Sequence, residues 1–293
     1  MKKIFIIIVY GLLITTYCFA QRDWYYYNGN NLATVAYDTD AQVYFSAMTT
    51  LLSDDQKIRV NSFIMRLKDS LSITSLSEKF DVMYLMANET SEASLKNLVK
   101  RSHDATAVNS PSWTQWEGFA GNGSTSYLNT NYTAIINTVT YTQNSASVGV
   151  YARTNQAGGY IDIGGSDASN VKALRFDISN GGVMYYRINS SIYADLTRAM
   201  ASGFYILDKT SKSFATVYYN GSSLTSNDFI TSDGLASVNI LIGAYRRATI
   251  TEAFSPRQYS FIFLGAGLSA VESRKITNCI EWYMDNIGTG VIP

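Results

Sequence analysis

The stretch from Ser147 to Asn189 reads SVGVYARTNQAGGYIDIGGSDASNVKALRFDISNGGVMYYRIN. Short runs of alternating apolar and polar residues are separated here by Gly, Asn and Ser, which is the pattern of antiparallel strands joined by tight turns. Within each run every second residue is apolar, and this set of residues is expected to face the core. Its members are Val148, Val150, Ile161, Ile163, Leu174, Phe176, Ile178, Met184, Tyr186 and Ile188. The other parity carries tyrosines, arginines and aspartates.

We interpret the polar parity as a candidate binding face. Tyrosine rings stack on sugar rings, and arginines and aspartates satisfy sugar hydroxyls, so carbohydrate is the ligand class that suits this face best. The alternative is that cross-strand pairs of tyrosine with arginine or aspartate only stabilise an exposed sheet. The candidate ligand-binding residues are Tyr151, Arg153, Tyr160, Arg175, Tyr185 and Arg187.

Further strands are expected on both sides of this stretch. Between Trp113 and Leu264, short strand candidates recur with turn residues between them, and about ten of them would form a two-sheet sandwich. Tyr259–Leu264 is apolar on both parities, which predicts a central strand covered on both faces. A strand is also expected at Leu95–Val99.

Helical periodicity precedes and follows the strands. In residues 38–87, apolar residues recur at spacings of three and four, which predicts two helices and a third short one with Phe80, Met83 and Tyr84 facing inward. Residues 269–287 begin with a serine–glutamate capping box and carry one apolar stripe, which predicts a C-terminal helix docked on the sandwich. The predicted fold class is α+β, mainly β: an antiparallel jelly-roll sandwich preceded by a small helical region and closed by a C-terminal helix.

The N-terminus has the features of a secretory signal peptide. Lys2 and Lys3 precede an apolar run, and small residues lead to a predicted cleavage after Ala20. A retained membrane anchor is the alternative, but the run of about 14 residues is short of the roughly 20 that span a bilayer. The predicted division is 1–20 signal peptide, 21–37 N-terminal arm, 38–100 helical region, 101–112 connector and 113–293 jelly roll with C-terminal helix.

Composition disfavours several classes of function. Lys+Arg and Asp+Glu both number 23, so the chain has no basic field to hold nucleic acid. The single histidine, His103, lies in a polar segment, which argues against a Ser-His-Asp triad, and zinc ligands are scarce. Calcium bound by Asp162 and Asp167 is a weaker alternative. Once the signal peptide is removed, Cys279 is the only cysteine, so an intramolecular disulfide is excluded. We therefore expect no metal and no cofactor.

Several motifs, taken in order, carry a resemblance. GNGSTSYLNTNY at 121–132, SVGVYARTN followed by IDIGG, FATVYYNGSSL, VNILIGA and FLGAGLSAVESRKI resemble the concanavalin A-like lectin/glucanase (laminin-G-like) jelly rolls. The most similar versions occur in virion and tail proteins of phages infecting Bacteroidetes and in secreted proteins of those bacteria. The segment that begins AYDTDAQVYFSAM is similar to the helical segment of those proteins. The signal peptide favours the secreted bacterial type over a virion protein.

The resemblance implies a fold more specifically than an activity. Glucanases on this jelly roll use a strand bearing E-x-D-x-x-E, which this sequence lacks, and Asp162 and Asp177 are the only carboxylates expected on the polar face. We therefore predict a non-catalytic, secreted or cell-surface module that binds a glycan or cell-surface polysaccharide. The alternative is a structural or adhesion protein of a phage particle or bacterial surface, with protein partners. A divergent glycoside hydrolase is the third possibility.

Overall fold

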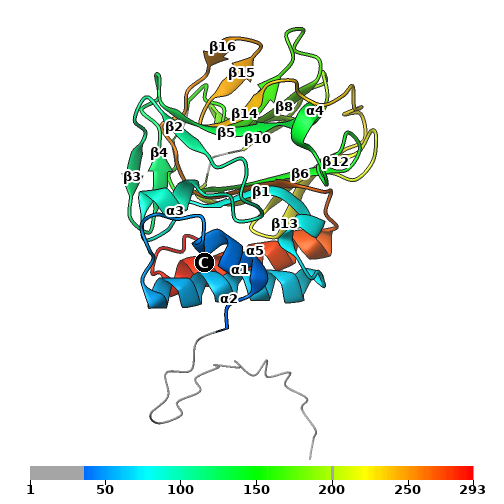
Figure 1. Cartoon of the computed structure of the whole chain (residues 1–293). Coiled ribbons are helices and arrows are strands. Elements are labelled where there is room, and N and C mark those ends of the chain that lie inside the picture. The colour runs from blue at the N-terminus through cyan, green and yellow to red at the C-terminus, as the bar shows by residue number, and fades with distance from the viewer. Residues whose placement is uncertain (1–35, 157, 199–200, 293) are drawn as a thin grey trace, which may run out of the picture. The chain divides into compact units, whose positions relative to one another are not determined.

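The computed structural model describes residues 36–156, 158–198 and 201–292. The predicted signal peptide and nearly all of the predicted arm lie outside these residues and stay predictions. Residues 37–293 cluster as one compact unit. Within the described part of the chain, two sheets pack face to face and helices lie against one of them (Figure 1). The predicted fold class is thereby confirmed as a mainly β, jelly-roll type sandwich with a C-terminal helix.

The first sheet, sheet A, faces the helices. All of its pairs are antiparallel, and the pair of β6 with β17 joins segments about 110 residues apart in the chain. In spatial order its strands are β13 (Ser222–Asn227), β12 (Ala215–Tyr219), β11 (Gly203–Lys209), β6 (Ala146–Ala152), β17 (Gln258–Gly265), β4 (Gly118–Ala120) and β3 (Ser112–Thr114), with β1 (Phe80–Leu85) also paired to β17.

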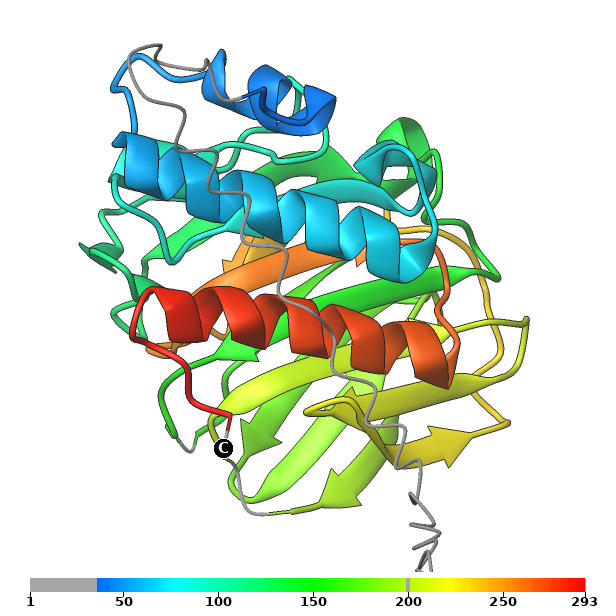
Figure 2. The same ribbon diagram turned by 90° about the horizontal axis from the view of Figure 1, so that it is seen from below.

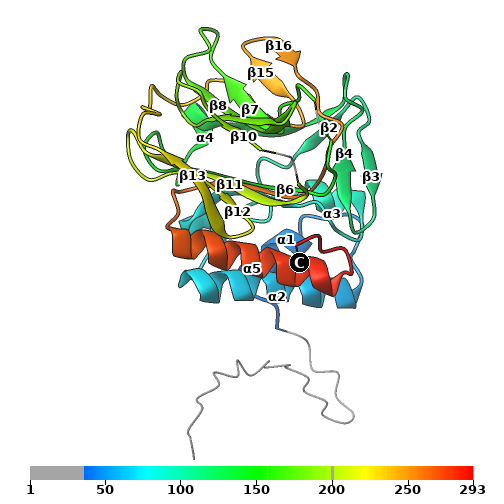
Figure 3. The same ribbon diagram turned by 180° about the vertical axis from the view of Figure 1, so that it is seen from behind.

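The second sheet, sheet B, lies on the side of the sandwich away from the helices (Figure 3). In spatial order its strands are β10 (Ala194–Thr197), β9 (Val183–Arg187), β8 (Ala173–Asn180), β7 (Ile163–Ser166), β14 (Asn239–Ile242), β5 (Tyr127–Thr133) and β2 (Thr106–Val108). A short hairpin of β15 (Tyr245–Arg247) and β16 (Ile250–Glu252) joins this sheet through a parallel pairing of β15 with β7.

The helices are confined to short connections and to one layer. Helices α2 (Asp54–Leu71) and α5 (Ala270–Asn286) lie side by side across the outer face of sheet A (Figure 2). The other helical segments are α1 (Thr39–Phe45), the 3-10 turn η1 (Leu76–Glu78), α3 (Ser91–Leu95) and α4 (Ala134–Asn137). In the described part of the chain, no helix is both long and apolar enough to cross a membrane.

The predicted capping box at the start of α5 is present. The Ser269 hydroxyl accepts from the backbone N–H of Glu272, and the Glu272 carboxylate accepts from the backbone N–H of Ser269 at 2.8 Å. The same reciprocal pair of bonds is formed by Ser75 and Glu78 at η1. These bonds satisfy amides that have no partner inside the helix, so the serine and glutamate spacing sets where each helix begins.

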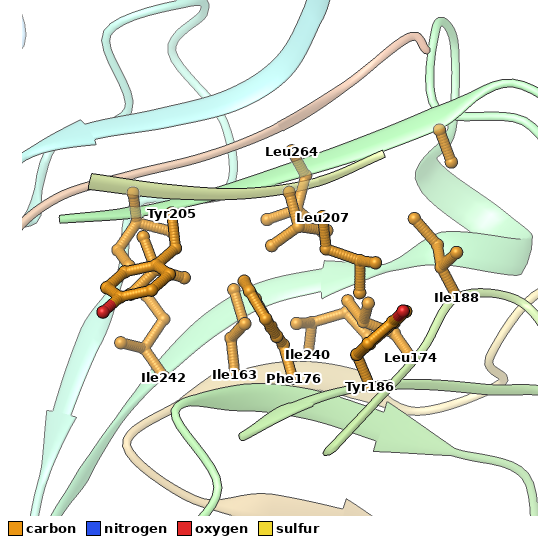
Figure 4. Close-up of a cluster of buried hydrophobic side chains, with 14 of the residues drawn as sticks. Ile163, Leu174, Phe176, Tyr186, Ile188, Tyr205, Leu207, Ile240, Ile242 and Leu264 are labelled. Carbon is orange, nitrogen blue, oxygen red and sulfur yellow. The ribbon is translucent and has the colours of Figure 1, made fainter. Parts of the chain in front are cut away.

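Apolar side chains form two layers of core, one on each face of sheet A. Between the sheets, residues such as Phe176, Leu207 and Ile240 point toward one another from opposite sides (Figure 4). Between sheet A and the helices, the ring of Phe63 on α2 lies 5.8 Å from that of Phe261 and 5.7 Å from that of Tyr283 on α5. Strand β17 contributes to both layers, which explains why its sequence is apolar on both parities.

Two local predictions in the N-terminal part are wrong. Phe80–Leu85 is strand β1 rather than a short helix. Residues 95–99 do not form a strand: Leu95 is the last residue of α3, and residues 96–99 lie outside any helix or strand. All six residues of β1 are buried, since the strand lies between the helix layer and the inter-sheet core. A strand covered on both faces loses its period of two, so the spacing of Phe80, Met83 and Tyr84 imitated a helix.

Candidate functional site

Strand β6 and the residue that follows it place two of the six candidate residues, Tyr151 and Arg153, on the covered side of sheet A. The Tyr151 side chain is fully buried, and its hydroxyl donates to Glu281 Oε2 of α5 at 2.7 Å and accepts from the backbone N–H of Val291 at 2.9 Å. Burial raises the pKa of Tyr151 well above its usual value. The Arg153 guanidinium donates to the Thr289 carbonyl and lies near the Glu117 carboxylate. Neither residue shares a face with the others, so the single six-residue face was a wrong prediction.

Tyr160 belongs to the connection between β6 and β7, where the chain crosses from sheet A to sheet B. Its half-buried ring lies 5.7 Å from the guanidinium carbon of Arg257. Arg257 and Asp162 form a fully buried ion pair, with Arg257 Nη1 at 2.9 and 2.7 Å from the two carboxylate oxygens. Tyr160 therefore packs beside a structural ion pair, in a connection between the two sheets and outside the strands of sheet B.

Strands β8 and β9 do bring Arg175, Tyr185 and Arg187 together. In the antiparallel register Arg175 lies opposite Arg187, and Asp177 lies opposite Tyr185. Their parity is opposite to that of the core residues Phe176 and Tyr186, so these side chains point to the outer side of sheet B. Arg175 Nη2 lies 2.5 Å from the Asp177 carboxylate. Burial raises the pKa of Asp177 to about 6, although the Arg175 guanidinium opposes that rise.

Three residues that the sequence analysis did not single out complete this surface. The Arg187 guanidinium, 1% exposed, donates to Asn170 Oδ1 at 2.6 Å and to the Tyr245 hydroxyl at 2.8 Å. Its central carbon lies 4.0 Å from the ring centre of Tyr193, and that of Arg175 lies 5.4 Å from the same ring. Tyr193 itself is 38% exposed. We call Arg175, Tyr185, Arg187, Tyr193 and Tyr245 the arginine–tyrosine cluster.

Tyr193 had a weak signal in the sequence. It directly precedes β10, whose ADLT segment is short and was not counted among the expected strands. Tyr245 lies about 58 residues beyond Arg187 in the chain, and its hydroxyl reaches the cluster only because β15 pairs with β7. Neither residue could be placed from periodicity, since their positions depend on pairings between distant segments.

The two carboxylates considered for glycoside hydrolysis are both fully buried. Asp162 is held by Arg257 and by the Tyr259 hydroxyl at 2.7 Å, and Asp177 is held by Arg175. A hydrolytic pair must reach the glycosidic oxygen and the anomeric carbon of a bound sugar. Asp162 and Asp177 do not reach solvent, so these two residues are not placed for that chemistry.

A shallow depression of about 310 Å³ lies where β14 and β15 diverge. Because Ile240 and Ile242 point into the inter-sheet core, Asn239 of the same strand points to the outer side of sheet B. The depression is therefore on the same side of the molecule as the arginine–tyrosine cluster. Its lining residues are Thr133, Ser237, Val238, Asn239, Arg246 and Ala248.

Comparisons with known proteins give remote structural similarities. No protein-family model matches the chain, and no curated protein matches it. Among solved structures, domain 4 of AbnA, a GH43 extracellular arabinanase from Geobacillus stearothermophilus in complex with arabinotriose, has a TM-score of 0.48 at 12% identity, over 68% of this chain and 98% of that one. The Ruminococcus gnavus IT-sialidase CBM40 bound to α2,3-sialyllactose has a TM-score of 0.39 at 13% identity, over 46% and 83%.

A third similarity is to the binding domain of botulinum neurotoxin serotype D, with a TM-score of 0.45 at 14% identity, over 68% of this chain and 52% of that one. With TM-scores below 0.5 and identities of 12–14%, these similarities carry no argument about function. The sugars named above are ligands of those proteins. The case for a ligand of this chain depends on its own geometry.

Proposed function

We propose that this chain is a non-catalytic carbohydrate-binding module of the concanavalin A-like (laminin-G-like) type, and that it binds a glycan on the outer face of sheet B. The observation that carries the proposal is the arginine–tyrosine cluster. Helices α2 and α5 lie against the outer face of sheet A, whereas strands β8 and β15, which carry members of the cluster, belong to sheet B on the opposite side of the sandwich (Figures 1 and 3). Within the described residues, the cluster therefore lies on a sheet face that α2 and α5 do not cover.

The chemistry of the cluster suits a sugar. Tyr193 presents an exposed ring on which a pyranose can stack, and the two arginines beneath it hold that ring in place. The half-buried Tyr185 and the outer N–H groups of Arg175 supply hydrogen bonds for hydroxyls. An aromatic platform fixed by its neighbours loses little conformational entropy on binding, which favours affinity for a flat, polar ligand.

The proposed setting is outside the cell. The signal peptide predicted for residues 1–20 would direct the chain to secretion or to the cell surface, and the proposed partner is a glycan or surface polysaccharide. Nucleic acid is not a proposed partner, because the formal charge of the chain is balanced. The proposal includes no metal and no cofactor.

The experiment is a glycan array of bacterial capsular, host mucin and plant polysaccharides, probed with the mature chain of residues 21–293. Tyr193→Ala should weaken any binding by about tenfold, because it removes the stacking surface. Phe214→Ala is the matched control, since its ring is 40% exposed and it precedes β12 of the other sheet. The proposal fails if no glycan class is bound, or if both variants change binding equally.

A structural or adhesion role with protein partners, on a bacterial surface or in a phage particle, is the second candidate. Its support is a run of exposed apolar side chains at and after α4: Ile135 is 50% exposed, Ile136 76% and Val139 70%. Exposed apolar groups gathered in one segment are typical of protein contacts. Light scattering of the mature chain tests this role. A stable oligomer that Ile136→Ser dissociates would favour it over the glycan module.

A further inference from the structure

The depression beside β15 differs chemically from the arginine–tyrosine cluster. Two consecutive residues of β15 contribute to the cluster and to the depression: the Tyr245 hydroxyl accepts from Arg187 in the cluster, while the Arg246 side chain lines the depression. No aromatic ring is among the lining residues, so a sugar cannot be held there by stacking. Recognition in the depression must come from its polar groups.

Those polar groups are mainly hydrogen-bond donors. The Thr133 hydroxyl donates to Asn239 Oδ1 at 2.6 Å, which uses the acceptor of the amide and leaves its NH₂ group for another partner. Arg246 Nε donates to the Ala248 carbonyl at 3.2 Å, which orients the guanidinium and leaves its two terminal nitrogens as a fork. Ser237 adds an exposed hydroxyl. The site is rich in donors and matches a ligand rich in acceptors.

The charge of the depression points the same way. Among the described residues that line it, none is acidic, and Arg246 forms no ion pair within the described part of the chain. The neighbouring Arg247 is instead 3.9 Å from Glu252. A guanidinium fork next to amide and hydroxyl donors is suited to a carboxylate, which it can bind through two parallel hydrogen bonds.

The backbone around the depression is held tightly. Asn239 of β14 lies opposite Thr133 of β5 in the sheet register. On the other side of β14, the neighbouring strand β7 carries Gly165, where a Cβ atom would come within 3.1 Å of Val238 Cγ2 and 3.2 Å of the Asn239 carbonyl oxygen. The glycine thus allows β7 to approach the strand that presents Asn239. A site framed by paired strands is preformed, which lowers the cost of ordering on binding.

We propose that the depression binds the carboxylate-bearing ring of an acidic sugar of the uronic acid class. Arg246 pairs with the carboxylate, and the amide of Asn239 and the hydroxyl of Ser237 bind the ring oxygens. A volume of about 310 Å³ is at the small end of ligand pockets and suits a single sugar ring. The inference rests on the proposed glycan-binding function and names the class of sugar that the module prefers.

The test is calorimetric titration of the mature chain with the methyl glycosides of glucuronic and galacturonic acid, and with those of glucose and galactose. Arg246→Gln should weaken uronide binding by about 10- to 100-fold, the usual effect of losing a charged hydrogen-bond partner. Arg247→Gln is the matched control, because it removes the same charge one residue along the same hairpin. It should change uronide affinity by less than about twofold.

Each outcome separates this inference from the proposed function. Equal effects of the two arginine variants would mean that only net charge matters, and would overturn the acidic-sugar site. Acetate competing as well as the uronides would overturn the sugar class, since only a bare carboxylate would then be recognised. Array binding that needs Tyr193 but not Arg246 would leave the proposed function standing and the uronide site refuted. Uronide binding that needs Arg246, with array binding insensitive to Tyr193→Ala, would leave the uronide site standing and refute the arginine–tyrosine cluster as the place where the glycan binds.

Discussion

Replacing Asp162 with asparagine should destabilise the protein strongly. The Asp162 carboxylate accepts from Arg257 Nη1 through both oxygens, from the Tyr259 hydroxyl at 2.7 Å and from the backbone N–H of Ile178 at 2.7 Å. Both charged side chains are fully buried. Asparagine keeps the shape but has one acceptor oxygen, so its NH₂ group would face donors, and the buried Arg257 would lose the carboxylate with which it forms its ion pair.

Removing one partner of a buried ion pair typically costs about 3–5 kcal/mol, because the other charge is left uncompensated. That is a large part of the roughly 5–15 kcal/mol that stabilises a folded domain. For a domain of this size it corresponds to a fall in melting temperature of roughly 6–20 °C. Urea unfolding followed by circular dichroism measures the change through the midpoint, with the slope as a check on two-state behaviour.

Glu252→Gln provides the control for this measurement. Glu252 lies 3.9 Å from Arg247, and both side chains are about 40% exposed, so its loss should cost less than about 1 kcal/mol. A loss below about 1 kcal/mol for Asp162→Asn as well would refute the reasoning. It would mean that a rearrangement compensates the buried charge of Arg257.

Three further predictions concern buried polar groups. Burial raises the pKa of Asp208 to about 7, so the wild type loses stability as the pH rises from about 4 toward 7 and this carboxyl ionises in the unfolded chain first. Asp208→Asn cannot ionise, so its urea midpoint should rise relative to that of the wild type across this pH range. Burial opposes ionisation of Asp81, but backbone hydrogen bonds from Thr140 and Val139 outweigh it and lower the pKa of Asp81, so the stability that Asp81 contributes is lost as the pH falls below 4. Asp81→Asn should therefore lower the free energy of unfolding by about 2–4 kcal/mol at pH 7 and by less in acid, which urea midpoints measured at a series of acidic pH values would show. Tyr151→Phe should cost about 1 kcal/mol in urea unfolding and leave glycan binding unchanged, and a loss of binding on the array would contradict the covered position of Tyr151.

Much of the architecture could be predicted from local patterns. Alternation in residues 147–189 identified the strands and their core side, and all of the expected core residues in that stretch are buried. The double-sided apolar run at Tyr259–Leu264 identified the central strand β17, and the capping box at Ser269 located the start of α5. These features are short-range, because the period of two and the capping of a helix depend on residues close together in the chain.

The candidate site could be predicted only in part. Arg175, Tyr185 and Arg187 were correctly placed on one face, because β8 and β9 are consecutive strands joined by a tight turn. Tyr151 has the same alternation but lies in the other sheet, where its hydroxyl meets Glu281, 130 residues further along the chain. Periodicity states which residues share one side of a strand, and it does not state what covers that side.

The sequence by itself determined most strands between residues 113 and 264, their inward parity, the C-terminal helix and the class of sandwich, because these follow from local preferences and from burial along each strand. Only the tertiary structure decided which polar face stays open. That choice depends on α2 and α5 packing across sheet A, and on β15 pairing with β7 to bring Tyr245 to the cluster and Arg246 to the depression. Both are contacts between distant segments, whose partners no local pattern encodes.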